Sequence, residues 1–202
     1  NSKLKVIDAS KGIQPIDQLS QVVHTGKEQS HDRAAGNPHV WLDPVLAEQQ
    51  VKNIRDGLIA ADPANKAKYE ANANAYLQQL ATLNTEFEQR LGQFRDRTFI
   101  TFHDAFPYLA KRYQLKQVAV VEIPEDQLSP ADVKETIDTV KQFQAKALFS
   151  EPGVDNKLLN GLSKDLNLKL RPLDSLEAGQ TDPQHYFTAM RSNLQTLETA
   201  FK

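Results

Sequence analysis

The second half of the chain alternates short apolar segments with longer amphipathic ones, and this alternation restricts the fold more than any other sequence feature. The apolar segments, each three to five residues long, are 98–102 (TFITF), 118–121 (VAVV), 147–150 (ALFS) and 168–170 (LKL). Helical patterns follow them, over residues 104–113, 129–143, 155–166 and 182–201. Short apolar strands that alternate with helices are typical of a parallel sheet covered by helices. The sequence therefore predicts an α/β fold for residues 95–202.

A long helix precedes this α/β region. Asp62 and Pro63 supply a helix-start signal, and the helical pattern continues to residue 94. The apolar residues of the pattern recur three or four positions apart, on one side of the helix. They are Tyr69, Ala73, Tyr76, Leu80, Leu83, Phe87, Leu91 and Phe94. A helix over residues 63–94 is about 50 Å long, which is enough to span a domain or to join two.

The first part of the chain gives a weaker pattern. Residues 4–8 (LKVID) favour a short strand, and residues 9–38 favour a polar loop interrupted by Gly and Pro. Asp43 and Pro44 begin a helix that extends to about residue 60. We therefore expect three parts: the remainder of an N-terminal lobe (1–62), a connecting helix (63–94) and a C-terminal α/β lobe (95–202).

Composition removes several classes of function. The 24 Lys and Arg residues nearly balance the 26 Asp and Glu residues, which argues against a nucleic-acid-binding protein. The chain has no cysteine, which excludes disulfide scaffolds, thiolate zinc fingers and cysteine nucleophiles. Binding of a transition metal must then use histidine and carboxylate groups. No segment approaches the roughly 20 apolar residues of a membrane-spanning helix.

Three polar residues follow predicted strands, at the edge where an open α/β sheet binds ligands. They are His103 after residues 98–102, Glu151 after residues 147–150, and Asp174 shortly after the last strand. His39 is a fourth candidate, from the other lobe. Imidazole nitrogens and a carboxylate oxygen can together complete a tetrahedral zinc site.

Each candidate also has a plainer interpretation. His103 can be a buried residue between aromatic neighbours, and His39 an ordinary loop residue. Asp174 can cap a turn or pair with Arg171, and Glu151 can support a neighbouring group rather than bind metal. The remaining histidines, His24, His31 and His185, are expected to be exposed. The sequence contains no HExxH pattern, P-loop or GxSxG motif.

The motifs taken together resemble a known family. They are residues 37–44 (NPHVWLDP), 101–109 (TFHDAFPYL), 149–152 (FSEP) and 173–176 (LDSL), with Tyr186, Met190 and Asn193 in the last helix. This set resembles the metal-binding solute-binding proteins of bacterial zinc and manganese ABC transporters, a group that includes lipoprotein adhesins. The resemblance implies two α/β lobes with parallel sheets flanked by helices, joined by one long rigid helix, with the metal between the lobes.

The resemblance also implies a ligand set. Carried over to this chain, it gives His39 from the NPH motif, His103 from the turn after the first strand of the second lobe, and Asp174 as the carboxylate. The family's first histidine, in a DPHxYEP-like motif, has no counterpart here, so the N-terminal lobe is expected to be incomplete. Zinc-type members resemble one another in having histidine where manganese-type members have glutamate, and His103 therefore predicts Zn²⁺.

Zinc-type members often carry a loop rich in His, Asp and Glu before the NPH motif. Residues 24–36 occupy that place but contain only His24, Glu28, His31 and Asp32 of these types. Either the loop is short, or its His-rich middle has been left out near residues 30–32. The chain also begins without Met or a signal segment, which suggests a processed or truncated form.

The expected function is capture of Zn²⁺ outside the cytoplasm and its delivery to a membrane ABC permease, by a monomer that catalyses no reaction. Because protons compete for imidazole, zinc affinity is expected to fall below about pH 6. Three alternatives stay open: a manganese-binding homologue, a surface adhesin containing a structural metal, and a zinc hydrolase with Glu151 as general base.

Overall fold

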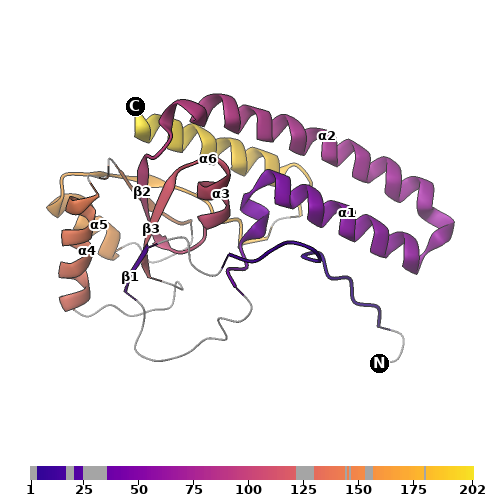
Figure 1. Cartoon of the computed structure of the whole chain (residues 1–202), viewed down its shortest axis with the longest axis horizontal. Coiled ribbons are helices and arrows are strands. Elements are labelled where there is room, and N and C mark those ends of the chain that lie inside the picture. Colours follow the sequence, from indigo (N-terminus) through magenta and orange to yellow (C-terminus); the bar gives the residue numbers. More distant parts are fainter. Residues whose placement is uncertain are drawn as a thin grey trace.

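The computed structural model describes residues 4–16, 21–24, 36–121, 130–143, 145, 147–152, 157–179 and 181–202. A five-stranded parallel sheet occupies one end of the molecule, and a long helical hairpin extends away from it (Figure 1). The α/β fold with a long helix, expected from the sequence, is confirmed. No helix in the described ranges is both long enough and apolar enough to cross a membrane.

The elements follow the expected alternation. The strands are β1 (Gln21–His24), β2 (Thr98–His103), β3 (Lys116–Val121), β4 (Ala147–Ser150) and β5 (Lys169–Pro172). The α-helices are α1 (Pro44–Ala61), α2 (Lys66–Leu91), α3 (Pro107–Arg112), α4 (Pro130–Gln142), α5 (Lys157–Asp165) and α6 (His185–Phe201). Short 3₁₀ turns are η2 (Val40–Leu42), η3 (Pro63–Asn65) and η4 (Gly92–Phe94).

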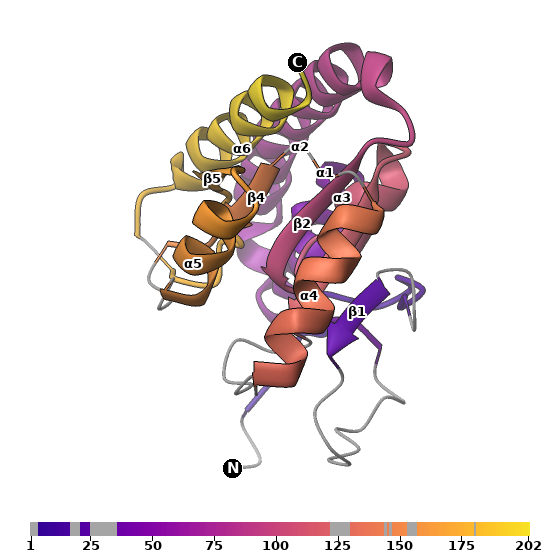
Figure 2. The same cartoon turned by 90° about the vertical axis from the view of Figure 1, so that its left-hand side faces the viewer.

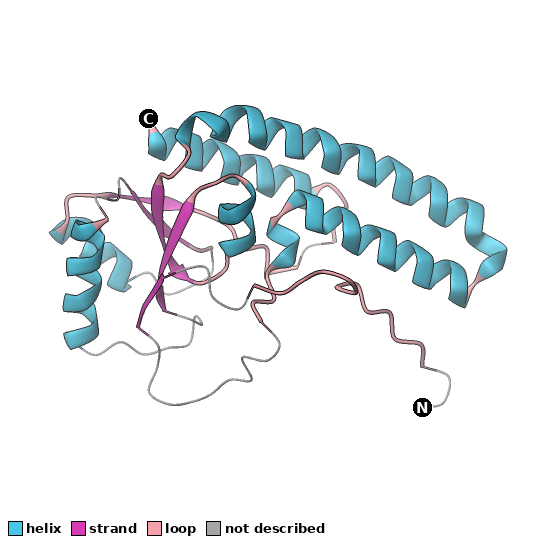
Figure 3. Ribbon diagram, in the orientation of Figure 1, coloured by secondary structure: helices cyan, strands magenta, loops and turns pink. Residues whose placement is uncertain are grey.

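The sheet has the strand order β1-β3-β2-β4-β5, and every neighbouring pair is parallel. The carboxyl ends of all five strands therefore lie at one edge of the sheet. Figure 3 shows strands in magenta among the helices in cyan. His103 is the last residue of β2, and it is in register with Val121, the last residue of β3. Strand β2, which carries this histidine, is the central strand of the sheet. Its carboxyl end lies at the edge where open α/β sheets generally bind ligands.

Helices cover both faces of the sheet. Figure 2 shows α4 and α5 on the near face and α2 and α6 behind. Phe99 and Phe149 of the sheet pack with α2, α3 and α6 in one buried cluster. Ile100 and Leu148 point to the other face and pack with residues of α4 and α5. Neighbouring positions of a strand thus serve opposite cores, as the pleat requires.

The long helix predicted over residues 63–94 is present, with a 3₁₀ turn at each end. Its predicted apolar side forms the core contact with the sheet and α6. Five residues of this side in α2 are buried: Ala73, Leu80, Leu83, Phe87 and Leu91. Helix α1 packs along α2, and together they form the hairpin in Figure 1.

Two predictions for the first part of the chain were wrong. Residues 4–8 are not a strand; Leu4 is 73% exposed and Val6 83% exposed, because no described strand pairs with this segment. The residues that follow it lie beside α1, where Asn53 Nδ2 donates to the carbonyl oxygens of Ala9 and Lys11. Residues 21–24, predicted as loop, form β1 beside β3. Only four residues long, this strand is too short for a clear pattern.

Two helices begin later in the chain than predicted. Helix α3 begins at Pro107 rather than at residue 104, since proline is favoured at the first helical position. Helix α6 begins at His185, after a turn in which Asp182 Oδ1 accepts the Gln184 N–H at 2.9 Å. The predicted start at Ser129 lies outside the described residues. The three-part division at residues 62 and 94 stays a prediction; β1, from the first part, joins the sheet of the last.

Candidate metal centre

His103 is held at the end of β2 by a carboxylate from the neighbouring strand. Its side chain is 1% exposed, and its Nδ1 lies 2.6 Å from Glu151 Oε1, directly after β4. The His103 backbone N–H donates to the same oxygen at 3.3 Å. Because a carboxylate accepts at Nδ1, the ring proton belongs on Nδ1 and the lone pair on Nε2. Glu151 thus orients the ring with Nε2 directed away from the sheet.

His39 is oriented in the same way by an amide. Asn37 Oδ1 lies 3.0 Å from the His39 backbone nitrogen and 2.9 Å from Nδ1. The Asn37 Nδ2 donates to the Asp104 carbonyl oxygen at 2.7 Å, which fixes which end of the amide faces the ring. His39 therefore also carries its proton on Nδ1 and leaves Nε2 as an acceptor.

The segment that carries His39 is anchored on both sides. The Tyr108 hydroxyl of α3 donates to the Asn37 carbonyl at 2.6 Å. Asp43 Oδ1 caps α1 by accepting the Val45 N–H at 2.9 Å, as its position before Pro44 predicts. Arg112 Nε donates to both Asp43 carboxylate oxygens. Burial nevertheless raises the pKa of Asp43, because the attraction of Arg112 does not compensate for lost hydration.

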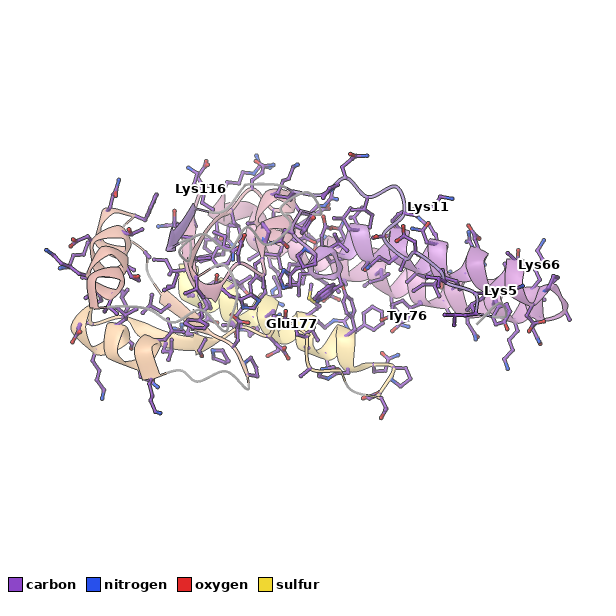
Figure 4. The ribbon with its side chains drawn as sticks, turned by 90° about the horizontal axis from the view of Figure 1, so that it is seen from below. Lys5, Lys11, Lys66, Tyr76, Lys116 and Glu177 are labelled. Atoms are coloured by element: carbon purple, nitrogen blue, oxygen red, sulfur yellow. The ribbon has the colours of Figure 1, made fainter. Side chains whose placement is uncertain are left out.

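Glu177, in the loop after β5, completes the group. The Nε2 atoms of His39 and His103 lie 3.4 Å apart, and Glu177 Oε1 lies 3.0 Å from His39 Nε2. The other oxygen of Glu177, Oε2, lies 3.7 Å from His103 Nε2. Among the described residues these three can present their ligand atoms within 4.8 Å of one another. Figure 4 marks Glu177 midway along the molecule, away from the tip of the hairpin.

These spacings suit a tetrahedral ion. For bonds of about 2.0–2.2 Å, the ligand atoms of a tetrahedral zinc site lie about 3.3–3.6 Å apart. The three distances of 3.0, 3.4 and 3.7 Å lie on both sides of that value. Small side-chain shifts would therefore bring all three groups into coordination.

The electrostatics of the three groups are coupled. Burial lowers the pKa of His39, although the Glu177 carboxylate, which accepts a hydrogen bond from Nε2 when the ring is protonated, acts in the opposite direction. Burial also tends to lower the pKa of His103, but the hydrogen bond to Glu151 and the charge of Glu151 outweigh this effect and raise the pKa. Burial tends to raise the pKa of Glu177, but the hydrogen bond and positive charge that the imidazoles supply when they are protonated outweigh it and lower this pKa. The centre thus holds an ionised carboxylate beside two imidazoles, one of which protonates readily.

The predicted ligands are only partly brought together. His39 and His103 meet, but the Asp174 carboxylate is not in the group of three. Its Oδ1 instead accepts the Leu176 N–H at 2.8 Å within the loop after β5. Sequence reasoning missed Glu177, three positions later, although a carboxylate beside the candidate Asp174 was a signal. Leu176, between the two carboxylates, has a φ of 58° in the left-handed region.

The other histidines lie apart from this centre. His185 begins α6, is half-buried and lines a cavity of about 230 Å³ with Asp174, rather than facing solvent completely. His24 ends β1, and its side chain lies outside the described residues, as does all of His31. The hypothesis of a loop shortened near residues 30–32 lies outside the described residues too.

Comparison with known proteins gives close relatives. The zinc-binding lipoprotein AdcA of Streptococcus pneumoniae is 37% identical over an alignment of 180 positions, which covers 87% of this chain and 36% of the relative. The high-affinity zinc uptake system protein ZnuA of Bacillus subtilis is 33% identical over an alignment of 206 positions, which covers 95% of this chain and 62% of the relative. The chain therefore spans about a third of the first relative's length and less than two thirds of the second's.

A solved structure has the same fold. A Zn(II)-bound variant of AdcAII from Streptococcus pneumoniae superposes with a TM-score of 0.79 at 31% identity, covering 98% of this chain and 71% of that one. The model of the ZnuA family, described as zinc-uptake complex component A, periplasmic, matches residues 1–200. Given this match over nearly its whole length, the chain belongs to the ZnuA family of zinc-uptake proteins.

Proposed function

We propose that the chain captures Zn²⁺ outside the cytoplasm and that the protein delivers the ion to a membrane ABC permease. The observation that carries the proposal is the convergence of three lone-pair donors: Nε2 of His39, Nε2 of His103 and the Glu177 carboxylate. Such groups repel one another when their lone pairs face one point, and a bound cation turns that repulsion into attraction. The names of the zinc-binding relatives support zinc as the cargo.

The mechanism is capture without catalysis. Asn37 and Glu151 hold the two imidazoles in the tautomer that directs Nε2 toward the ion. The Glu177 carboxylate supplies the third ligand and neutralises part of the ion's charge. A tetrahedral ion keeps a fourth position for water or a further protein ligand. All three ligand atoms are nitrogen or oxygen, so that release needs no change in thiol chemistry.

The donor set favours zinc over manganese. Imidazole suits Zn²⁺, whereas Mn²⁺ prefers carboxylate, carbonyl and water oxygens. A site with two imidazoles and one carboxylate therefore favours Zn²⁺ over Mn²⁺. The position of Glu151 also argues against a hydrolase, because its Oε1 lies at Nδ1 of His103, on the other side of the ring from Nε2. A general base would have to reach a water on the ion.

The location and assembly follow from the same proposal. Relatives are named as a lipoprotein and as part of a zinc uptake system, which supports a place outside the cytoplasm and a permease as partner. The formal net charge of −2 favours neither nucleic acid nor an anionic membrane surface as partner. We expect the protein to act as a monomer.

The test is a competitive titration of the full chain with Zn²⁺ and Mn²⁺ against a coloured chelator. The expected result is one site that prefers Zn²⁺ and that is lost together with His39 or His103. Equal zinc affinity in the parent and in a His39→Ala, His103→Ala double variant would overturn the proposal.

A further inference from the structure

The loop that presents Glu177 contains an unfavourable backbone conformation. Leu176, the residue before it, has a φ of 58° in the left-handed region that side chains other than Gly rarely adopt. Such a conformation persists only where surrounding contacts impose it, and it is common at ligand-binding sites. The contacts that impose it here therefore determine where Glu177 points.

The first set of contacts comes from α6 through Asp174. Asn193, which is 2% exposed, accepts the Asp174 N–H at 2.8 Å and donates to the Asp174 carbonyl at 2.7 Å. Both backbone groups of Asp174 are thus fixed by one buried amide. The Asp174 carboxylate in turn accepts the Leu176 N–H at 2.8 Å. This chain of hydrogen bonds runs from a rigid helix to the residue whose conformation redirects the loop.

A second set of contacts comes from the segment that carries His39. Trp41 Nε1 donates to the Ser175 carbonyl at 2.8 Å, and the Tyr186 hydroxyl donates to the Trp41 carbonyl at 2.8 Å. The Ser175 hydroxyl donates to Glu177 Oε2 at 3.1 Å. The loop is therefore fastened to both the His39 segment and α6. This matters because the Glu177 side chain is 42% exposed, and burial alone does not hold it in place.

We propose that Asp174 and Asn193 are positioning residues for zinc binding, which hold the turn at Leu176 so that Glu177 reaches the two imidazoles. The proposal rests on the proposed function of the centre, and it gives Asp174 a role other than that of a ligand. Without the Asp174 acceptor, the Leu176 turn can relax and Glu177 can move away from the ion. Zinc affinity then falls, although the two histidines keep their positions.

The test compares Asp174→Ala with Asp174→Asn in the full chain. An asparagine at this position keeps a side-chain oxygen that can accept the Leu176 N–H, whereas alanine does not. We expect Asp174→Ala to weaken zinc binding about 10- to 100-fold, the range for partners that orient a ligand. Asp174→Asn should bind zinc nearly as well as the parent. If Asp174 were itself a ligand, both variants would lose affinity, and the positioning role would be overturned.

A double variant and cobalt absorption separate positioning from general loss of structure. Because Asp174 acts through Glu177, Asp174→Ala should cost little in a Glu177→Gln background; additive losses would refute the proposal. The visible absorption of bound Co²⁺ should change in the same way in Asp174→Ala and Glu177→Gln, and stay parental in Asp174→Asn. An unchanged spectrum in Asp174→Ala would also count against it.

The two proposals fail in different ways. If His103→Ala and Glu177→Gln both bind zinc like the parent, the centre itself is not the zinc site. If these variants lose zinc while Asp174→Ala keeps full affinity, the zinc site stands and the positioning role alone is refuted.

Discussion

The Nε2 atoms of His39 and His103 lie 3.4 Å apart, although 64 positions separate the two residues in the chain. Each ring is fixed through its other nitrogen, by Asn37 in one case and by Glu151 in the other. Two separately anchored imidazoles therefore present their lone pairs to the same point. Such preorganisation lowers the cost of assembling the ligands when an ion arrives.

Replacing His103 tests the centre directly. We expect His103→Ala to weaken zinc binding by more than about 100-fold, beyond the range for losing an orienting partner. The measurement is competition with a chelator of known affinity. His185→Ala is the matched control, because His185 lies on α6 outside the group of three, and it should keep the parental affinity. A parental value for His103→Ala would refute the assignment.

Zinc should stabilise the fold as well as bind to it. A ligand present at 100 times its dissociation constant raises the free energy of unfolding by about 2.7 kcal/mol. We expect the unfolding temperature of the parent to rise steeply as zinc fills the site. After the site is saturated, this temperature should rise only slowly with the concentration of free zinc. The His39→Ala, His103→Ala double variant should show no such shift. A shift of equal size in both proteins would indicate binding elsewhere.

The pH dependence of zinc affinity should follow His103. Since Glu151 raises the pKa of His103 above its ordinary value of 6.5, protons begin to compete with zinc above that pH. Affinity should therefore be full at higher pH and decline as the pH falls through the raised pKa. The measurement is a series of zinc titrations from about pH 5 to about pH 8, where imidazole titrates.

Glu151→Gln supplies the control for this pH profile. Glutamine keeps an oxygen that accepts from Nδ1 but removes the negative charge that favours protonated His103. The decline in affinity should then move to lower pH, because burial of His103 acts without that charge. At neutral pH the variant should still bind more weakly than the parent, about 10- to 100-fold. An unmoved profile would show that Glu151 does not set the pKa.

The core beneath the centre should be sensitive to a cavity. Phe87 of α2 is fully buried and stacks on Tyr113 with ring centroids 5.1 Å apart. We expect Phe87→Ala to lower the free energy of unfolding by about 3–5 kcal/mol, measured by urea denaturation without metal. Ile54→Ala, at a residue of α1 that is 43% exposed, should change it by only about 0.5 kcal/mol. Similar losses in both variants would contradict this description of the core.

Much of the fold could be predicted because its signals are local. Strand β2 ends at His103, and its apolar residues alone predict it; Asp43 and Pro44 likewise predict the start of α1. Residues 4–8 show the limit of this approach. Their pattern favours a strand, but a strand exists only when another strand supplies its hydrogen bonds, and no described one does.

The candidate site was harder to predict because two carboxylates lie close together in one loop. His39 and His103 lie in distinctive motifs, and parallel strands must end at one edge. Asp174 and Glu177 are only three positions apart, and Leu176 between them has a φ of 58° that no sequence pattern indicates. The preceding Asp174 is held through its backbone by Asn193, a residue of α6. Periodicity and spacing contain no information about such a contact.

The distance along the chain between the ligands has a consequence for folding. His39 and Glu177 are 138 positions apart, and they meet only when the sheet and helices between them have formed. An ion bound by both residues would cross-link the two ends of this long loop. Closing the loop costs conformational entropy, and in the folded chain this cost has already been met before the ion binds. Metal affinity therefore also measures how complete the fold is, and a substitution far from the centre can weaken zinc binding by loosening the loop.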